Sequence, residues 1–318
     1  MTNTSTWLEN WHSNGVTVGS AELLYYRSKV AAFSRHNRLH PPKSQAGVLL
    51  SKHKGRGMEF DEVRHYQAGD DVRAIDWRVT ARTGTPHTKL FREERERPIM
   101  FVVDLDHSQH FGSGLLLKSV QACHLTAALS WQAITRGDRV GAIIGRPGRH
   151  LEIRPQARQQ GAMRIIHSLT ELQRESVADW QQAAPAQPDL LNDLLSRARQ
   201  VARPGTIIYL ISDWQAADEE TFNLCQALQR HCQIYPLQLF DPLERELPTN
   251  LAAYNLSLTD GRQRLALPAW SGTERTAYQH AAAQRQLQLT ARFKRSNLQL
   301  REVNAARALE EQWPEVMA

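Results

Sequence analysis

The sequence has few cysteines and no long apolar run. The three cysteines are Cys123, Cys225 and Cys232, and no two of them form a C-x-x-C pair. This argues against a disulfide framework and favours a reducing compartment. No stretch of about eighteen apolar residues is present, so no membrane-spanning helix is predicted. The opening MTNTSTWLENWHSNG lacks the basic and then apolar regions of a signal peptide. We therefore expect a cytoplasmic protein.

Several motifs of known chemistry are also missing. There is no P-loop, no G-x-S-x-G elbow and no H-E-x-x-H pair. His107 and His110 have no His/Cys cluster around them, so a zinc site is not predicted. The net charge of +6 is mild for 318 residues and forms no basic block. Nucleic-acid binding remains an alternative that rests on this mild basicity alone.

From residue 98 onward, apolar strand patterns alternate with helical ones. Strands are expected at IMFVVD, DRVGAIIG, GTIIYLISD and CQIYPLQLFD, with HLEIRP as a hairpin partner of the second. Long amphipathic segments separate them, among them 157–174, 188–202 and 217–230. Such alternation predicts a mostly parallel sheet between helices, an α/β fold.

The segment before residue 98 has a different pattern of apolar and charged residues. In RAIDWRVT, the alternation of Ile75, Trp77 and Val79 with polar residues predicts a half-buried strand. The acids of this segment alternate with arginines, which favours an ion-paired surface over a nuclease-like acidic cluster. We divide the chain into an N-terminal helical segment (1–43), a β-rich module (44–97), the α/β core (98–304) and a C-terminal helix (305–318).

Acidic residues follow the core strands where these end. Asp104, Asp106 and Ser108 form D-x-D-x-S after the first strand, and Asp213 and Asp241 follow later ones. In parallel sheets, ligands bind beyond the carboxyl ends of the strands. Carboxylate and hydroxyl oxygens suit Mg²⁺. The same residues also suit structural roles, with Asp106 or Ser108 capping a turn. Asp213 would likewise cap the helix at 217–230.

A phosphatase of the haloacid dehalogenase type is the enzymatic alternative. In it, Asp104 is the nucleophile, Asp106 is the general acid and Ser212 supplies the later hydroxyl. That family then needs a lysine followed by an acidic strand end. The only lysine after Ser212 is Lys294, which comes after the strand that ends at Asp241. The order of these motifs argues against the phosphatase.

One long block carries a family resemblance. It contains G-x-G-x-E-F (Gly55, Gly57, Glu59, Phe60) and then R-x-Y-x-x-G-D-D-x-R-x-I-D-W (Arg64 to Trp77), and it ends in the strand before Asp104. GDRVG at 137–141 and LISDW at 210–214 match as well. In these motifs the chain resembles the domain of unknown function 58 family (DUF58), over roughly residues 40–245.

The resemblance implies a fold, a site and a partner. The family core is similar to a von Willebrand factor A domain, a Rossmann-like sheet with a metal-ion-dependent adhesion site at its carboxyl edge. Members are associated with MoxR-type AAA+ ATPases, and they are inferred to be adaptors or assembly factors rather than enzymes. The implied Mg²⁺ ligands in this chain are Asp104, Asp106, Ser108 and Asp213.

The adhesion-site pattern is only partly matched. It has D-x-S-x-S, in which Asp104 and Ser108 fit and Asp106 replaces the middle serine. It has a threonine before a later helix, where this chain shows Pro188 and no threonine. Asp213 fits the later acid. The extra carboxylate at Asp106 either compensates for the missing hydroxyl or pairs with a basic group and leaves no metal site.

Overall fold

The computed structural model describes residues 4–34, 58–93, 97–248, 255–259, 264–268 and 271–317. The chain divides into two compact units, one made of Met1–Leu39 with Arg97–Ala318 and the other of His40–Glu96. The start of the predicted β-rich module, including Gly55 and Gly57, lies outside the described residues.

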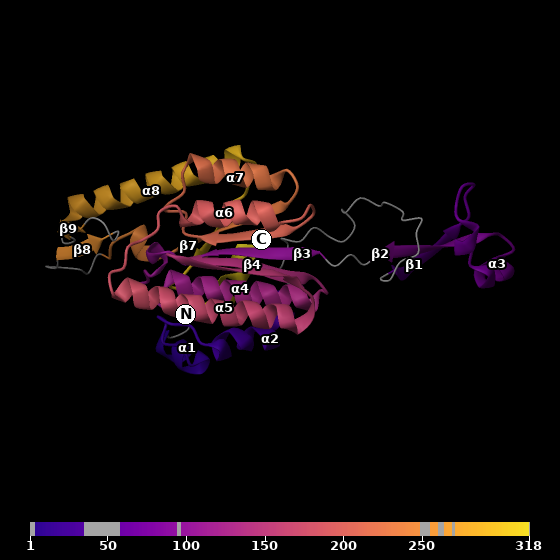
Figure 1. Cartoon of the computed structure of the whole chain (residues 1–318), viewed down its shortest axis with the longest axis horizontal. Coiled ribbons are helices and arrows are strands. Elements are labelled where there is room, and N and C mark those ends of the chain that lie inside the picture. Colours follow the sequence, from indigo (N-terminus) through magenta and orange to yellow (C-terminus); the bar gives the residue numbers. More distant parts are fainter. Residues whose placement is uncertain are drawn as a thin grey trace. The chain divides into compact units, whose positions relative to one another are not determined.

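A six-stranded sheet forms the centre of the larger unit. Its order is β10-β7-β6-β3-β4-β5, and every neighbouring pair is parallel except β4 with β5 (Figure 1). The mostly parallel α/β sheet is therefore confirmed, and so is the hairpin. The strands are β3 (Pro98–Asp104), β4 (Arg139–Arg146), β5 (Arg149–Gln156), β6 (Ile207–Ser212), β7 (Gln233–Phe240) and β10 (Arg301–Asn304).

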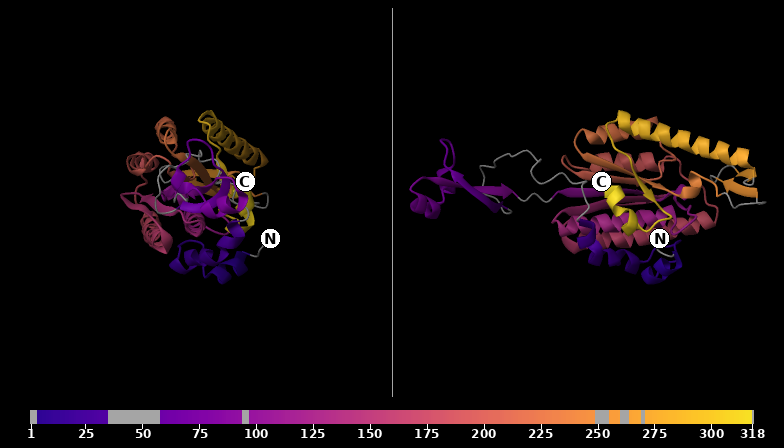
Figure 2. Two further views of the ribbon diagram at one scale, coloured as in Figure 1. Left: turned by 90° about the vertical axis from the view of Figure 1, so that its right-hand side faces the viewer. Right: turned by 180° about the vertical axis from the view of Figure 1, so that it is seen from behind.

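Helices cover both faces of this sheet, as Figure 2 shows from two further sides. One face carries α4 (Lys118–Thr135) and α5 (Arg158–Gln181), with α1 (Thr4–Trp11) and α2 (Ser20–Ser34) packed outside them. The other carries α6 (Leu190–Val201), α7 (Glu219–Gln229) and α8 (Gly272–Arg295). The chain ends in α9 (Leu309–Met317). No helix within the described ranges is long and apolar enough to cross a membrane.

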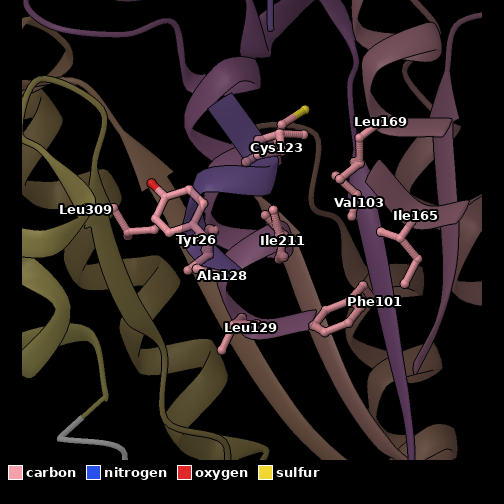
Figure 3. Packing of buried hydrophobic residues seen from close by; sticks show 14 of the residues in the cluster. Tyr26, Phe101, Val103, Cys123, Ala128, Leu129, Ile165, Leu169, Ile211 and Leu309 are labelled. Atoms are coloured by element: carbon pink, nitrogen blue, oxygen red, sulfur yellow. The ribbon is translucent and has the colours of Figure 1, made fainter. Parts of the chain in front are cut away.

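Alternate residues of β3 supply two apolar cores. Phe101 and Val103 face α4 and α5, where they pack with Leu129 and Ile165 (Figure 3). Met100 and Val102 belong to the opposite core, under α6 and α7. All four of these β3 side chains are at most 1% exposed. A strand that is buried on both faces needs a continuous apolar run, and this explains the sequence IMFVV.

The loop before α4 is held by both ends of the chain. The Leu117 amide donates to the Gly15 carbonyl at 2.8 Å, and the Leu116 amide donates to the Ala305 carbonyl at 3.1 Å. Gly114 packs so closely on Ala306 that a Cβ at position 114 would lie 2.6 Å from the alanine Cβ. Residues that precede the sheet strands in the sequence and residues that follow them thus both fix the start of α4.

The smaller unit contains an antiparallel pair of strands, β1 (Met58–His65) and β2 (His87–Glu93). Between them lie η2 (Val72–Ala74) and a short helix, α3 (Trp77–Thr83). The predicted strand across RAIDWRVT is therefore wrong. The Asp76 carboxylate accepts from the Arg78 and Val79 amides, and Gly84 ends the helix at φ 76°. These caps outweigh an alternation of only three apolar residues.

A second hairpin, β8 (Asn255–Thr259) with β9 (Arg264–Pro268), precedes α8. Two 3₁₀ turns lie after sheet strands: η3 (His107–Gln109) after β3, and η4 (Pro242–Glu244) after β7. Both turns are at the carboxyl edge of the sheet, where the sequence predicts a site.

Candidate functional site

The carboxyl edge of the sheet brings together acids from three adjacent strands. Because β3 pairs with β6 and β6 with β7, Asp104, Asp213 and Asp241 follow neighbouring strand ends. They are 4%, 5% and 0% exposed. We call this group the strand-end site; it consists of Asp104, Asp106, Lys118, Ser212, Asp213, Asp241 and Glu244.

Both carboxylate oxygens of Asp104 have hydrogen-bond donors. The Ser212 hydroxyl donates to Oδ2 at 2.7 Å, and the Asp106 amide donates to Oδ1 at 2.9 Å. Burial raises the pKa of Asp104 to about 7, with further contributions from the negative charges of Asp213 and Asp106. The two hydrogen bonds oppose this shift without cancelling it.

Asp106 lies where the adhesion pattern has a serine. Its carboxylate is buried and accepts a 3.4 Å hydrogen bond from the Gln187 amide, just before Pro188. Burial raises the pKa of Asp106. The side chain makes no capping hydrogen bond to η3, so the predicted capping role of Asp106 is wrong. Ser108 lies half-buried inside η3.

The structure adds a buried lysine that the sequence analysis missed. Lys118, in the first turn of α4, is 0% exposed. Its ammonium donates to Asp213 Oδ2 at 2.8 Å and to Glu244 Oε1 at 2.5 Å. Burial alone lowers the pKa of this ammonium, but the charges of Asp213 and Glu244 outweigh burial and the net pKa is raised. Lys118 is therefore a charged group inside the protein.

Both oxygens of Asp213 and of Glu244 accept hydrogen bonds. The Gln215 amide donates to Asp213 Oδ1 at 3.1 Å. The Gln215 side-chain amide shares Glu244 Oε1 with Lys118 at 2.8 Å, and the Asp241 amide donates to Glu244 Oε2. The predicted capping of the helix at 217–230 by Asp213 is wrong, because Asp218 caps α7 through the Thr221 amide. Trp214 has φ 62° and buries its ring beside Phe293.

Asp241 has a structural role at this edge. It accepts hydrogen bonds from the amide and hydroxyl of Ser113 and from the Leu243 amide. Glu244 completes the turn by accepting from the Asp241 amide at 2.9 Å. These contacts tie the loop before α4 to η4 and place Glu244 against Lys118.

A second buried network surrounds His110. Its Nε2 lies 2.7 Å from the Ser176 hydroxyl, and its Nδ1 lies 3.0 Å from the Ser119 hydroxyl. Since Ser176 donates its proton to the Leu105 carbonyl, His110 Nε2 is the donor and Nδ1 the acceptor. Burial lowers the pKa of His110 to about 3, so the ring is neutral.

A divalent ion does not fit the strand-end side chains as they are arranged. Within the described ranges, no three His, Cys, Asp or Glu side chains are grouped closely enough to hold a metal. The ammonium of Lys118 contacts Asp213, one of the four predicted ligands. A divalent ion at Asp213 would be repelled by this positive charge.

The arrangement also bears on the phosphatase alternative. Ser212 ends β6, where that alternative places its later hydroxyl, and it donates to Asp104. The basic group at the site is Lys118, which precedes Ser212 in the chain, whereas Lys294 lies in the last turn of α8. Asp104 is buried and both of its oxygens accept hydrogen bonds from protein donors, an arrangement typical of a structural carboxyl group rather than of an exposed nucleophile.

Comparisons with known proteins agree with the family that the motifs indicate. The family model described as "Protein of unknown function DUF58" matches residues 62–288. Uncharacterized proteins Mb1516 of Mycobacterium bovis and Rv1480 of Mycobacterium tuberculosis are each 32% identical over 224 residues, covering 69% of this chain and 68% of theirs.

Two solved structures resemble the fold distantly. The conserved hypothetical protein BatB from Bacteroides thetaiotaomicron matches with a TM-score of 0.40 at 11% identity, covering 68% of this chain and 93% of that one. An aerotolerance-related membrane protein from Bacteroides fragilis matches with a TM-score of 0.41 at 14% identity, covering 70% and 98%.

Proposed function

The chain belongs to the DUF58 family, and from this membership we propose that it is a non-enzymatic adaptor. Its partner is a MoxR-type AAA+ ATPase, with which it assembles or activates other proteins. The support for this partner is the family resemblance of the motif block from Arg64 to Trp77. The proposal includes no nucleic-acid partner, because the positively charged residues form no contiguous block along the sequence.

The core of the proposed adaptor is similar to a von Willebrand factor A domain. The sheet order β10-β7-β6-β3-β4-β5, with one antiparallel strand at its edge, supports this likeness. In such open sheets, ligands bind beyond the carboxyl ends of the strands, where the chain order reverses. Here the chain order reverses at β3, because β4 lies on one side of it and β6 on the other.

The observation that carries the proposal is the built polar network at that point. Asp104, Asp106 and Asp213 are fixed by backbone amides, a serine hydroxyl and a lysine. Gln215 is exposed beside them and marks the adjacent surface. A fixed edge of this kind suits docking of another protein, because little ordering entropy is lost on association.

A pull-down of the full chain against the MoxR-type ATPase of the same organism tests this. We expect Gln215→Arg, which adds a long charged side chain beside the strand-end site, to abolish capture. Gln160→Arg is the matched control, since Gln160 is exposed in the first turn of α5, near the amino end of the sheet. Equal capture by both variants would show that the docking surface lies elsewhere.

The adaptor is distinguished from the phosphohydrolase by a phosphatase screen. The two hydrogen bonds to Asp104 and its burial favour a structural carboxyl group over a nucleophile. We expect no Mg²⁺-dependent turnover of phosphomonoesters by the wild-type chain. Turnover that Asp104→Asn abolishes would replace the adaptor by the enzyme.

A further inference from the structure

We propose that Lys118 is a built-in cation that makes the strand-end site independent of divalent metal. Its ammonium supplies a positive charge to both Asp213 and Glu244, as an ion does at an adhesion site. The inference deepens the proposed function, because it names the positive charge at the same site. Its measurements need no partner protein, so its failure and that of the proposed adaptor are distinguishable.

The ammonium of Lys118 lies between two carboxylates. Lys118 Nζ lies 2.8 Å from Asp213 and 2.5 Å from Glu244, so the two carboxylates flank one point. Asp213 follows β6, and it is the residue at which the family pattern has its later acid. Glu244 comes from the turn after the next strand, β7. A positive charge thus bridges two adjacent strand ends.

The ion pair is largely shielded from water. The side chains of Lys118 and Asp213 are 0% and 3% exposed, and that of Glu244 is 21% exposed. Taking an ammonium out of water is costly unless it is paired and hydrogen-bonded. The four-carbon stem passes through the protein from the first turn of α4, where every residue from Lys118 to Ala133 is buried. A lysine held in this way is a permanent part of the edge.

The other expected carboxylate ligands already contact protein donors. Asp104 has both oxygens bound by protein donors. Asp106 accepts from the Gln187 amide, at the place where the pattern has a threonine. With Asp213 paired to Lys118, the expected carboxylates already have protein partners, and a divalent ion would have to displace them.

The test is a Mn²⁺ titration of the full chain, in which the electron paramagnetic resonance signal of the free ion measures binding. Wild type is expected to bind no Mn²⁺ at this site at millimolar concentration. Lys118→Ala removes the ammonium and its stem, which leaves two carboxylates facing an open position that suits a hard cation. We expect this variant to bind one Mn²⁺ with a Kd about tenfold or more below the millimolar concentration at which wild type binds none.

Three matched variants assign the gain. Lys118→Met removes the charge but fills the space, so it should gain no Mn²⁺. Adding Asp213→Asn to Lys118→Ala should remove the gained affinity. Lys29→Ala deletes a lysine whose ammonium lies 4.9 Å from the centre of the Tyr25 ring, and it should behave as wild type.

Thermal unfolding gives a second measurement. Lys118→Ala should melt below wild type and recover in a saturable way with Mn²⁺, whereas wild type should not respond. If Lys118→Ala folds only when Mn²⁺ is present, that also supports the proposal. Saturable wild-type Mn²⁺ binding that Asp213→Asn abolishes would overturn it, and so would a folded Lys118→Ala that gains no affinity.

Discussion

The Ser212 hydroxyl donates a 2.7 Å hydrogen bond to the Asp104 carboxylate, and it thereby joins the ends of β6 and β3. Both residues are buried, at 1% and 4% exposure. The same hydroxyl oxygen accepts from the Trp214 amide at 3.1 Å. One side chain therefore fixes both the carboxylate of one strand end and the backbone that follows the other.

Replacing Ser212 by alanine should destabilise the protein. A buried carboxylate oxygen and a buried amide lose their partner together, and leaving such groups unsatisfied costs about 1–3 kcal/mol. Urea unfolding of the variant measures the loss. Ser28→Ala is the control, because the Ser28 hydroxyl bonds to the Tyr25 carbonyl on an exposed helix surface. A loss no greater than that of the control would contradict the assigned role of Ser212.

The ionisation of Asp104 should make stability fall as the pH rises. Its folded-state pKa is about 7, against 3.8 ordinarily, so between these values the folded state binds more protons than the unfolded state. The stabilising contribution is present at low pH and is lost as the pH rises through 7. Asp104→Asn cannot ionise and should lack this loss, which is at most about 4 kcal/mol.

Denaturant unfolding of wild type and Asp104→Asn at pH 5 and pH 8 checks this. Wild type should lose more stability than the variant between the two pH values. Parallel behaviour of the two proteins would mean that Asp104 is ionised throughout this range.

His110 should act in the opposite direction, at lower pH. Its folded-state pKa is about 3, against 6.5 ordinarily, so below 6.5 the unfolded state binds the proton that the folded state refuses. The protein should lose about 1.4 kcal/mol per pH unit from this group as the pH falls below 6.5. His110→Asn keeps polar groups near Ser119 and Ser176 but cannot take up the proton.

The difference in unfolding free energy between wild type and His110→Asn should therefore shrink as the pH falls from 7 to 5. Unfolding curves at several pH values measure it. A difference that stays constant with pH would show that the imidazole gains its proton in the folded state as easily as in the unfolded chain.

Asp76→Ala should loosen α3 in the smaller unit. The carboxylate caps the helix, and its ion pair with Lys89, at 3.5 Å, is lost as well. Loss of such a cap lowers the local stability of the helix, so exchange of amide hydrogens over 77–83 should speed up several-fold. Trp77→Ala is the control, since Trp77 is 70% exposed and its removal should leave exchange nearly unchanged. Equal rates in the two variants would refute the capping role.

Much of the core follows from local sequence patterns. The apolar runs at Ile99 and Ile207 predict buried parallel strands because a strand covered on both faces has no polar alternation. That topology then places Asp104 and Asp213 at one edge, as the structure confirms. The α3 segment was predicted as a strand because Ile75, Trp77 and Val79 alternate with polar residues by chance. Asp76 and Gly84 supply the caps that make it a helix.

Lys118 was missed for a different reason. Its partners, Asp213 and Glu244, lie 95 and 126 residues away, so no local pattern joins them. One signal was present in the sequence: Lys118 stands directly after LLL at the start of a helix that is otherwise apolar or neutral. A single charge in such a segment requires a buried partner, although the sequence does not say which acid supplies it.

The hydrogen bonds of Leu117 to Gly15 and of Leu116 to Ala305 have a practical consequence for work with shortened proteins. The family-matched span, residues 62–288, is the obvious fragment to express, but it omits both acceptors and the whole of β10. Such a fragment would leave the first turn of α4 untethered on two sides and expose one edge of β7. Weak binding by the fragment would then result from a misplaced Lys118 and would not show that the full chain fails to bind.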